Sequence, residues 1–185
     1  SRPIPRDLLD SYKNSVLVDD FICSLKKYSL VIDQKPSPSS IGQSFSMHQS
    51  TQDIGLIYLT KALNIHKNKK LLQTISTTLE NYMADAIDKD DLERMKLLIS
   101  HCEWFLKHPQ LLEEGDKKAI GGELGGLYFY VKNYPKAQQV LKESLHKGAS
   151  DLHTASTLVY LGLVYKELSE HKKAKNLFEK SLALY

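Results

Sequence analysis

The sequence predicts a mainly α-helical protein, in which an α–α superhelix of repeated helix pairs follows a small segment with one β-hairpin. Three observations predict this fold. Apolar residues recur at helical spacing over most of residues 70–185, a unit of about 20 residues occurs twice near the C-terminus, and a short β-branched stretch precedes a Pro/Ser-rich loop. With 185 residues, of which 42% are hydrophobic, the chain can bury a core without disulfides or metals.

The N-terminal segment, 1–66, is expected to contain short helices and one hairpin. The pattern predicts, in order, helices at 5–13 and 18–28, a strand at 28–33, a polar loop at 34–42, a returning strand at 44–47 and a helix at 50–63. Helix, helix, hairpin, helix is the order found in a winged-helix unit. The lysine-rich run 66–70 then links this segment to the helical array.

Residues 70–108 predict the first helix pair of the array. Apolar residues follow helical spacing over 70–88 and over 91–108, and the second helix is expected to end near Pro109. Between them Asp90 is the expected N-cap. Because terminal repeats are often atypical, this pair is interpreted as a degenerate repeat that begins the superhelix.

Two further helix pairs, 116–147 and 151–185, share one pattern. Leu124-Gly125-Gly126-Leu127-Tyr128 matches Leu161-Gly162-Leu163-Val164-Tyr165, and Ala137 matches Ala174, always at an offset of 37 (174 minus 137). A glycine inside a helix costs roughly 1 kcal/mol relative to alanine. Gly125 and Gly162 therefore predict that a partner helix crosses closely at each of them, with Ala137 and Ala174 providing the small residue on that partner.

The order of these residues resembles the tetratricopeptide repeat (TPR), whose pattern has Leu-Gly, an aromatic residue, then Ala, a bulky residue and a small one. The first aromatic position of that pattern instead falls on Gly121 and Leu158. The period of 37 residues exceeds the usual length of about 34 and is similar to the long-period repeats of kinesin light chains. The resemblance implies a TPR-like superhelix that binds a protein or peptide on its concave face.

By that resemblance, the first helix of each repeat lines the groove. The inward positions are Ala119, Gly122, Gly126, Phe129 and Tyr130, then Ser156, Val159, Leu163, Lys166 and Glu167. TPRs that hold a C-terminal carboxylate need Lys and Asn where this chain has Gly122 and Gly126, so a carboxylate clamp is excluded. An amphipathic helix, an extended apolar peptide or a neighbouring helix of the same protein fits the groove better.

The N-terminal segment resembles the winged helix of nucleotide-switched signalling ATPases with an NB-ARC module (the STAND class). The shared sequence motifs are Leu25-Lys26-Lys27-Tyr28-Ser29-Leu30 and Met47-His48-Gln49-Ser50-Thr51-Gln52, and TPRs follow them. In that family the histidine after methionine reaches the β-phosphate of ADP and holds the switched-off state. The resemblance therefore implies a nucleotide role for His48 and a TPR sensor that shifts the winged helix.

The sequence contains no G-x-x-x-x-G-K-[ST] motif, so no cofactor is expected in this chain, and ADP or ATP is implied only for an ATPase module preceding Ser1. The predicted function is a non-enzymatic, regulatory interaction fragment of such a switch protein. A free-standing TPR adaptor that binds apolar peptides is the alternative. The absence of a cap after Tyr185 also predicts self-association through the last repeat.

The composition of the chain and the spacing of its residues argue against a nucleic-acid-binding protein, a membrane or secreted protein, and a metal site. The net charge of +3 gives no reason to expect nucleic acid, and no apolar run suits a membrane span or a secretion signal, so a cytoplasmic location is expected. Cys23 and Cys102 are expected to be reduced, buried side chains. His101, Cys102, Glu103 and His108 are dismissed as metal ligands, because adjacent helical residues point to different faces.

Overall fold

The computed structural model describes residues 3–12, 15–33, 44–62, 64, 67–108, 111–145 and 152–184. Contacts divide the chain into two compact units, Ser1–Tyr82 and Met83–Tyr185. The division falls inside helix α4 (Lys69–Asp88), whereas the sequence places the domain boundary at 66–70. The polar loop 34–42, Pro109 and the terminal Tyr185 lie outside the described residues.

Unit 1 contains a three-stranded antiparallel sheet instead of the expected hairpin alone. In chain order its elements are β1 (Pro3–Pro5), α1 (Arg6–Tyr12), α2 (Ser15–Lys27), β2 (Val31–Asp33), β3 (Ser44–Met47), α3 (Gln49–Ile57) and a π-helical turn (Tyr58–Ala62). The strand order is β1-β3-β2, and Ile4 pairs with Phe45. The two prolines argue against a strand in sequence, but β1 lies at the sheet edge, where a missing N–H is tolerated.

The core of unit 1 forms between α2 and the sheet. Val18 and Ile22 from α2 pack with Val31 of β2 and Phe45 of β3, all of them buried. The strand predicted at 28–33 begins only at Val31, because Ser29 has a left-handed backbone (φ 54°) that ends α2. Leu30 N–H then bonds to the Leu25 carbonyl (2.9 Å), which closes the helix with a common C-terminal turn.

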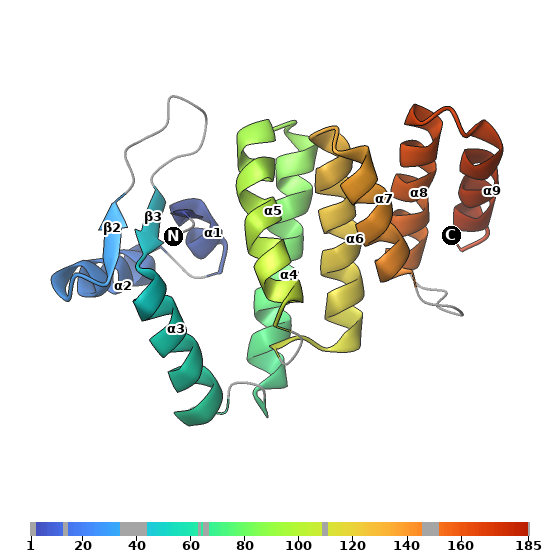
Figure 1. The fold of residues 1–185 in the computed structure, drawn as a ribbon. Helices are drawn as coiled ribbons and strands as arrows, with labels where there is room; N and C mark the ends of the chain where they lie inside the picture. Colours follow the sequence, from blue (N-terminus) through green and yellow to red (C-terminus); the bar gives the residue numbers. More distant parts are fainter. Residues whose placement is uncertain are drawn as a thin grey trace. The chain divides into compact units, whose positions relative to one another are not determined.

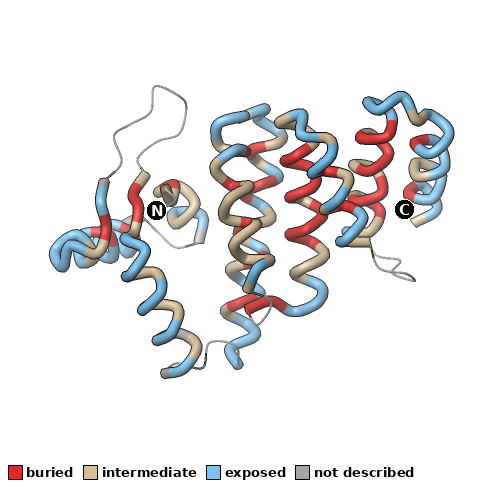
Figure 2. Tube along the Cα trace, viewed as in Figure 1, coloured by how far each residue is buried: buried red, intermediate tan, exposed pale blue. Residues whose placement is uncertain are grey.

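Unit 2 contains the rest of α4 and five more helices in the described residues: α5 (Leu92–Leu106), α6 (Glu114–Tyr130), α7 (Tyr134–Ser144), α8 (Leu152–Glu167) and α9 (His171–Leu182) (Figure 1). The helices form antiparallel pairs, α6 with α7 and α8 with α9, and buried residues line α6 and α8 (Figure 2). This arrangement confirms the predicted mainly helical, TPR-like fold.

The same turn joins all three helix pairs. Asp90, Lys132 and Ser169 have left-handed backbones, with φ of 51°, 61° and 61°. In each turn the next N–H bonds to the carbonyl five residues earlier: Asp91 to Ala86, Asn133 to Tyr128, and Glu170 to Tyr165. The pair at 70–108 lacks the Leu-Gly pattern but has the same turn geometry. Its interpretation as a degenerate repeat stays a prediction.

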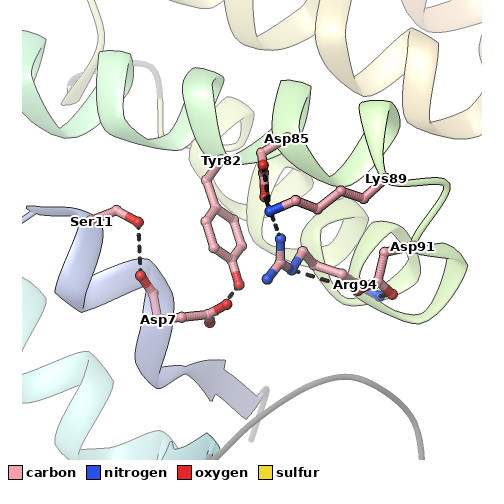
Figure 3. A network of polar contacts seen from close by, with 7 residues as sticks. All are labelled: Asp7, Ser11, Tyr82, Asp85, Lys89, Asp91 and Arg94. Carbon is pink, nitrogen blue, oxygen red and sulfur yellow. Dashed lines mark hydrogen bonds and ion pairs between the residues drawn. The ribbon is translucent and has the colours of Figure 1, made fainter.

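The α4–α5 turn corrects one prediction and is held by an ionic cluster (Figure 3). The N-cap of α5 is Asp91, whose carboxylate accepts from Arg94 N–H at 3.0 Å, and Asp90 is the residue that turns the chain. Lys89 and Arg94 both contact the Asp85 carboxylate at 2.7 Å.

A separate hydrogen bond lies within unit 1, where the Tyr82 hydroxyl donates to the Asp7 carboxylate at 2.6 Å.

The two mid-helix glycines lie where the repeat predicts them. A Cβ built on Gly125 would lie 2.3 Å from Leu141 on α7, and one built on Gly162 would lie 2.6 Å from Phe178 on α9. Leu141 and Phe178 are themselves 37 residues apart (178 minus 141). Ala137 and Ala174 are buried as expected. The predicted close crossing of the two helices is therefore confirmed in both repeats.

Candidate functional site

The contact between the two repeats is made by glycines of α6 and larger side chains of α8. A Cβ on Gly122 would lie 2.6 Å from the Thr157 hydroxyl, and one on Gly126 would lie 2.8 Å from the Tyr160 ring. Both glycines are buried, as is Ala119. Side chains of α8 thus fill the space beside these predicted groove residues. Their part in binding a partner stays a prediction.

The other predicted groove residues are more accessible. On α6, Phe129 and Tyr130 are half-buried. On α8 the half-buried residues are Ser156, Val159 and Leu163, and the exposed ones are Lys166 and Glu167. The α8 side therefore presents an apolar stripe that ends in a cation and an anion. We call Phe129, Tyr130, Val159, Leu163 and Tyr160 the helix A surface, because all of them lie on the first helix of a repeat.

Aromatic rings gather at the C-terminal end of α6. Phe129 and Tyr130 meet edge to face at 5.4 Å between centroids, Tyr134 lies 5.9 Å from Phe129, and Tyr160 lies 6.4 Å from Tyr130. Tyr160 was not among the predicted groove residues. The sequence feature that indicates this contact is Gly126, because the absence of a side chain there leaves room for the Tyr160 ring. Aromatic residues of this kind are the usual anchors of protein interfaces.

A partly buried polar contact joins α5 to α6. The Tyr128 hydroxyl donates to the Glu103 carboxylate at 2.6 Å. Burial first, and then this negative partner, raise the pKa of Tyr128, so the phenol stays protonated. Beside it Cys102 is fully buried, with its sulfur 3.1 Å from that of Met83, and burial and the charge of Glu123 raise its thiol pKa. Cys102 is thus an unreactive core residue, as predicted.

The second cysteine differs from its prediction. Cys23 is exposed on α2, because it follows Ile22 and therefore points about 100° away from the buried helix face. Of the dismissed metal ligands, His108 stacks on Trp104 at 4.0 Å, and its Nδ1 lies 2.7 Å from the Trp104 carbonyl. In the part of the chain that the structure describes, no three His, Cys, Asp or Glu side chains gather as a metal site would need.

His48 lies at the junction of β3 and α3, as the N-cap residue of α3. Its side chain is exposed and makes no capping hydrogen bond. The turn between β3 and α3 is stabilised by a hydrogen bond between residues on either side of His48, in which the Gln52 side chain donates to the Met47 carbonyl at 2.9 Å. This geometry leaves the imidazole at the surface. Its predicted nucleotide role stays a prediction.

Comparison with known proteins finds one family. The model of the tetratricopeptide repeat matches residues 119–185, which begin within α6 and include α7, α8 and α9. No curated protein matches the chain. The matched repeats are typically a non-enzymatic module for protein–protein interaction, so the C-terminal repeats indicate a protein or peptide partner. None of the described helices has the length and apolar character needed to cross a membrane.

Proposed function

We propose that the repeats bind a protein or peptide partner on the helix A surface, with Phe129 and Tyr130 as anchors. The observation that carries the proposal is the gathering of half-buried aromatic rings beside an apolar stripe on α8. Half-buried rings have already lost part of their water and conformational freedom, so a partner gains affinity from covering the remainder.

The chemistry of the surface favours an apolar partner segment. Gly122 and Gly126 supply neither the cation nor the amide of a carboxylate clamp, and Thr157 and Tyr160 occupy the space beside them. Val159 and Leu163 are four positions apart on α8, so both lie on the same side of this helix. They can therefore pack against the apolar face of an amphipathic partner helix. Lys166 and Glu167 at the end of this stripe provide charges that can fix the orientation of the partner.

Peptides selected from a random displayed library on the purified chain test this proposal. The selected peptide is measured by fluorescence anisotropy against Tyr130→Ala and a matched control, Gln139→Ala on the exposed face of α7. Removal of an aromatic anchor is expected to cost about 2 kcal/mol, or about thirtyfold in affinity. Equal binding by the two variants would place the binding site elsewhere.

We further propose that the chain is the sensor fragment of a nucleotide-switched ATPase, in which partner binding releases His48 from ADP. The exposed position of His48 supports this role, because the imidazole is accessible to another module. Unit 1 also has an exposed apolar surface, with Phe21 on α2 51% exposed and Ile54 on α3 67% exposed. Apolar side chains so exposed suit the docking of another domain.

The test of the switch needs the longer protein, with the ATPase module whose presence is proposed here. Retention of bound ADP is measured after gel filtration for the unchanged protein, for His48→Ala and for a neighbouring control, Gln49→Ala. The proposal expects faster loss of ADP from His48→Ala alone. A gene without an upstream P-loop, or normal ADP retention by His48→Ala, favours the alternative of a free-standing adaptor.

A further inference from the structure

A second candidate surface lies between α8 and α9. A cavity of about 360 Å³ is lined by Leu161, Tyr165, Lys172, Lys173, Asn176 and Leu177. Its floor is apolar, because Leu161 is buried and Leu177 is half-buried, and its rim carries two exposed lysines. Leu161 and Leu163 differ by two positions, or about 200° around the helix. The cavity is therefore on the opposite side of α8 from the helix A surface.

Positive charge is concentrated around one ring of this cavity. The Lys142 ammonium of α7 lies 5.6 Å from the centre of the Tyr165 ring, and the Lys173 ammonium lies 5.2 Å from it. Lys173 also pairs with Glu170. Helix α9 carries four lysines against one glutamate, a net charge of +3 that equals the formal net charge of the whole chain. The cavity thus lies in the most basic part of the repeats.

In the preceding repeat, an acidic side chain binds the tyrosine that is equivalent to Tyr165. Tyr128 is the counterpart of Tyr165 (165 minus 128 is 37), and its hydroxyl donates to Glu103 of the preceding helix α5 at 2.6 Å. At Tyr165 the preceding helix α7 supplies Lys142 instead. Among the residues that the structure describes, no side chain hydrogen-bonds the Tyr165 hydroxyl. The preceding helix thus places a carboxylate on the Tyr128 hydroxyl, whereas lysines of α7 and α9 lie beside the buried ring of Tyr165.

We propose that this cavity binds an acidic segment of a partner protein in which a carboxylate lies next to an aliphatic side chain. The aliphatic group contacts Leu161 and Leu177, and the carboxylate meets Lys142 and Lys172 and accepts from the Tyr165 hydroxyl. The apolar floor selects for the aliphatic group and the lysines select for the charge. A purely basic or uncharged peptide gains only part of these contacts.

Fluorescence anisotropy on the full chain tests the proposal with a labelled peptide that combines glutamate and leucine. A matched peptide with glutamine in place of each glutamate measures the contribution of the charge. The test variant is Lys142→Gln/Lys172→Gln, and the control is Lys175→Gln/Lys180→Gln. Both double variants remove two exposed lysines. Lys172 lines the cavity and Lys142 lies beside the Tyr165 ring, whereas the control positions do neither.

The acidic peptide is expected to bind the test variant about tenfold more weakly, because each lysine contributes a modest surface ion pair. The control variant should change affinity by less than about twofold. Equal losses in both variants, or equal binding of the glutamine peptide, would overturn the proposal. So would tighter binding of a labelled single-stranded DNA that is lost in the test variant, because the basic surface would then be a nucleic-acid site.

Discussion

The packing of Gly125 against Leu141 gives the sharpest test of the repeat. A methyl group at Gly125 would lie 2.3 Å from two carbons of Leu141, whereas carbon atoms pack favourably at about 3.5–4.0 Å. Leu141 is fully buried, so it has no free space into which to move. Overpacking of this kind costs about 1–3 kcal/mol, and the better helix propensity of alanine returns up to about 1 kcal/mol. We expect Gly125→Ala to lose about 1–2 kcal/mol.

Urea unfolding followed by the fluorescence of Trp104 measures this loss. Trp104 is the only tryptophan of the chain and lies on α5, in unit 2. Gly115→Ala on the same helix α6 is the matched control, because a Cβ there meets nothing within 4 Å. The control should keep or slightly raise the stability. A Gly125→Ala protein as stable as the control would refute the close crossing of α6 and α7.

A double-mutant cycle separates the clash from other effects of Gly125→Ala. Leu141→Ala alone should cost about 2–5 kcal/mol, because it leaves a cavity in a buried site. In the double variant the new methyl group occupies part of the space that Leu141 vacates. The combined loss should therefore be smaller than the sum by at least about 0.5 kcal/mol. Strict additivity would show that the two residues do not contact each other.

Three further predictions concern single groups. The Lys89 hydrogen bond, with help from Arg94, lowers the pKa of Asp85 below its ordinary 3.8. Stability from this carboxylate is therefore present above about pH 4 and lost as the pH falls through the folded pKa, and Asp85→Asn should flatten the dependence of urea midpoint on acidic pH. Iodoacetamide should alkylate Cys23 but not Cys102 in the native protein, as read by peptide mass spectrometry, and both after unfolding. Ser169→Gly should raise the free energy of unfolding by up to about 1 kcal/mol, because glycine adopts the φ of 61° without strain.

The sequence predicts the contacts within a repeat better than the contacts between repeats. A glycine inside a helix implies a close neighbour, and the 37-residue offset identifies the same pair twice, Gly125 with Leu141 and Gly162 with Phe178. The offset shows which positions are equivalent but not which helix covers them. For this reason the sequence predicts Gly122 and Gly126 as groove-lining positions without indicating that Thr157 and Tyr160 of α8 lie against them.

Strand β1 shows a second limit of the sequence. Its prolines lower the local preference for a strand, and its partner β3 begins about 40 residues later in the chain. The burial of Phe45 and Val31 beneath α2 stabilises the sheet to which this edge strand adds. Tertiary packing therefore overrides the local signal. The same reasoning explains Cys23, since its helix has apolar residues on more than one face and only the packed face is buried.

Equivalent positions of the two repeats have diverged in what they offer to a partner. Tyr128 and Tyr165 occupy the same place in the pattern, yet Glu103 closes the first and Lys142 borders the second. Gly122 and Gly126 accept the next repeat closely, whereas their counterparts Val159 and Leu163 are large and half-buried. Small residues are needed where the next repeat packs closely on a helix. Large side chains instead increase affinity where a separate partner binds. The divergence thus gives α8 large, half-buried side chains on the helix A surface, and it leaves the Tyr165 side of the same helix bordered by cations.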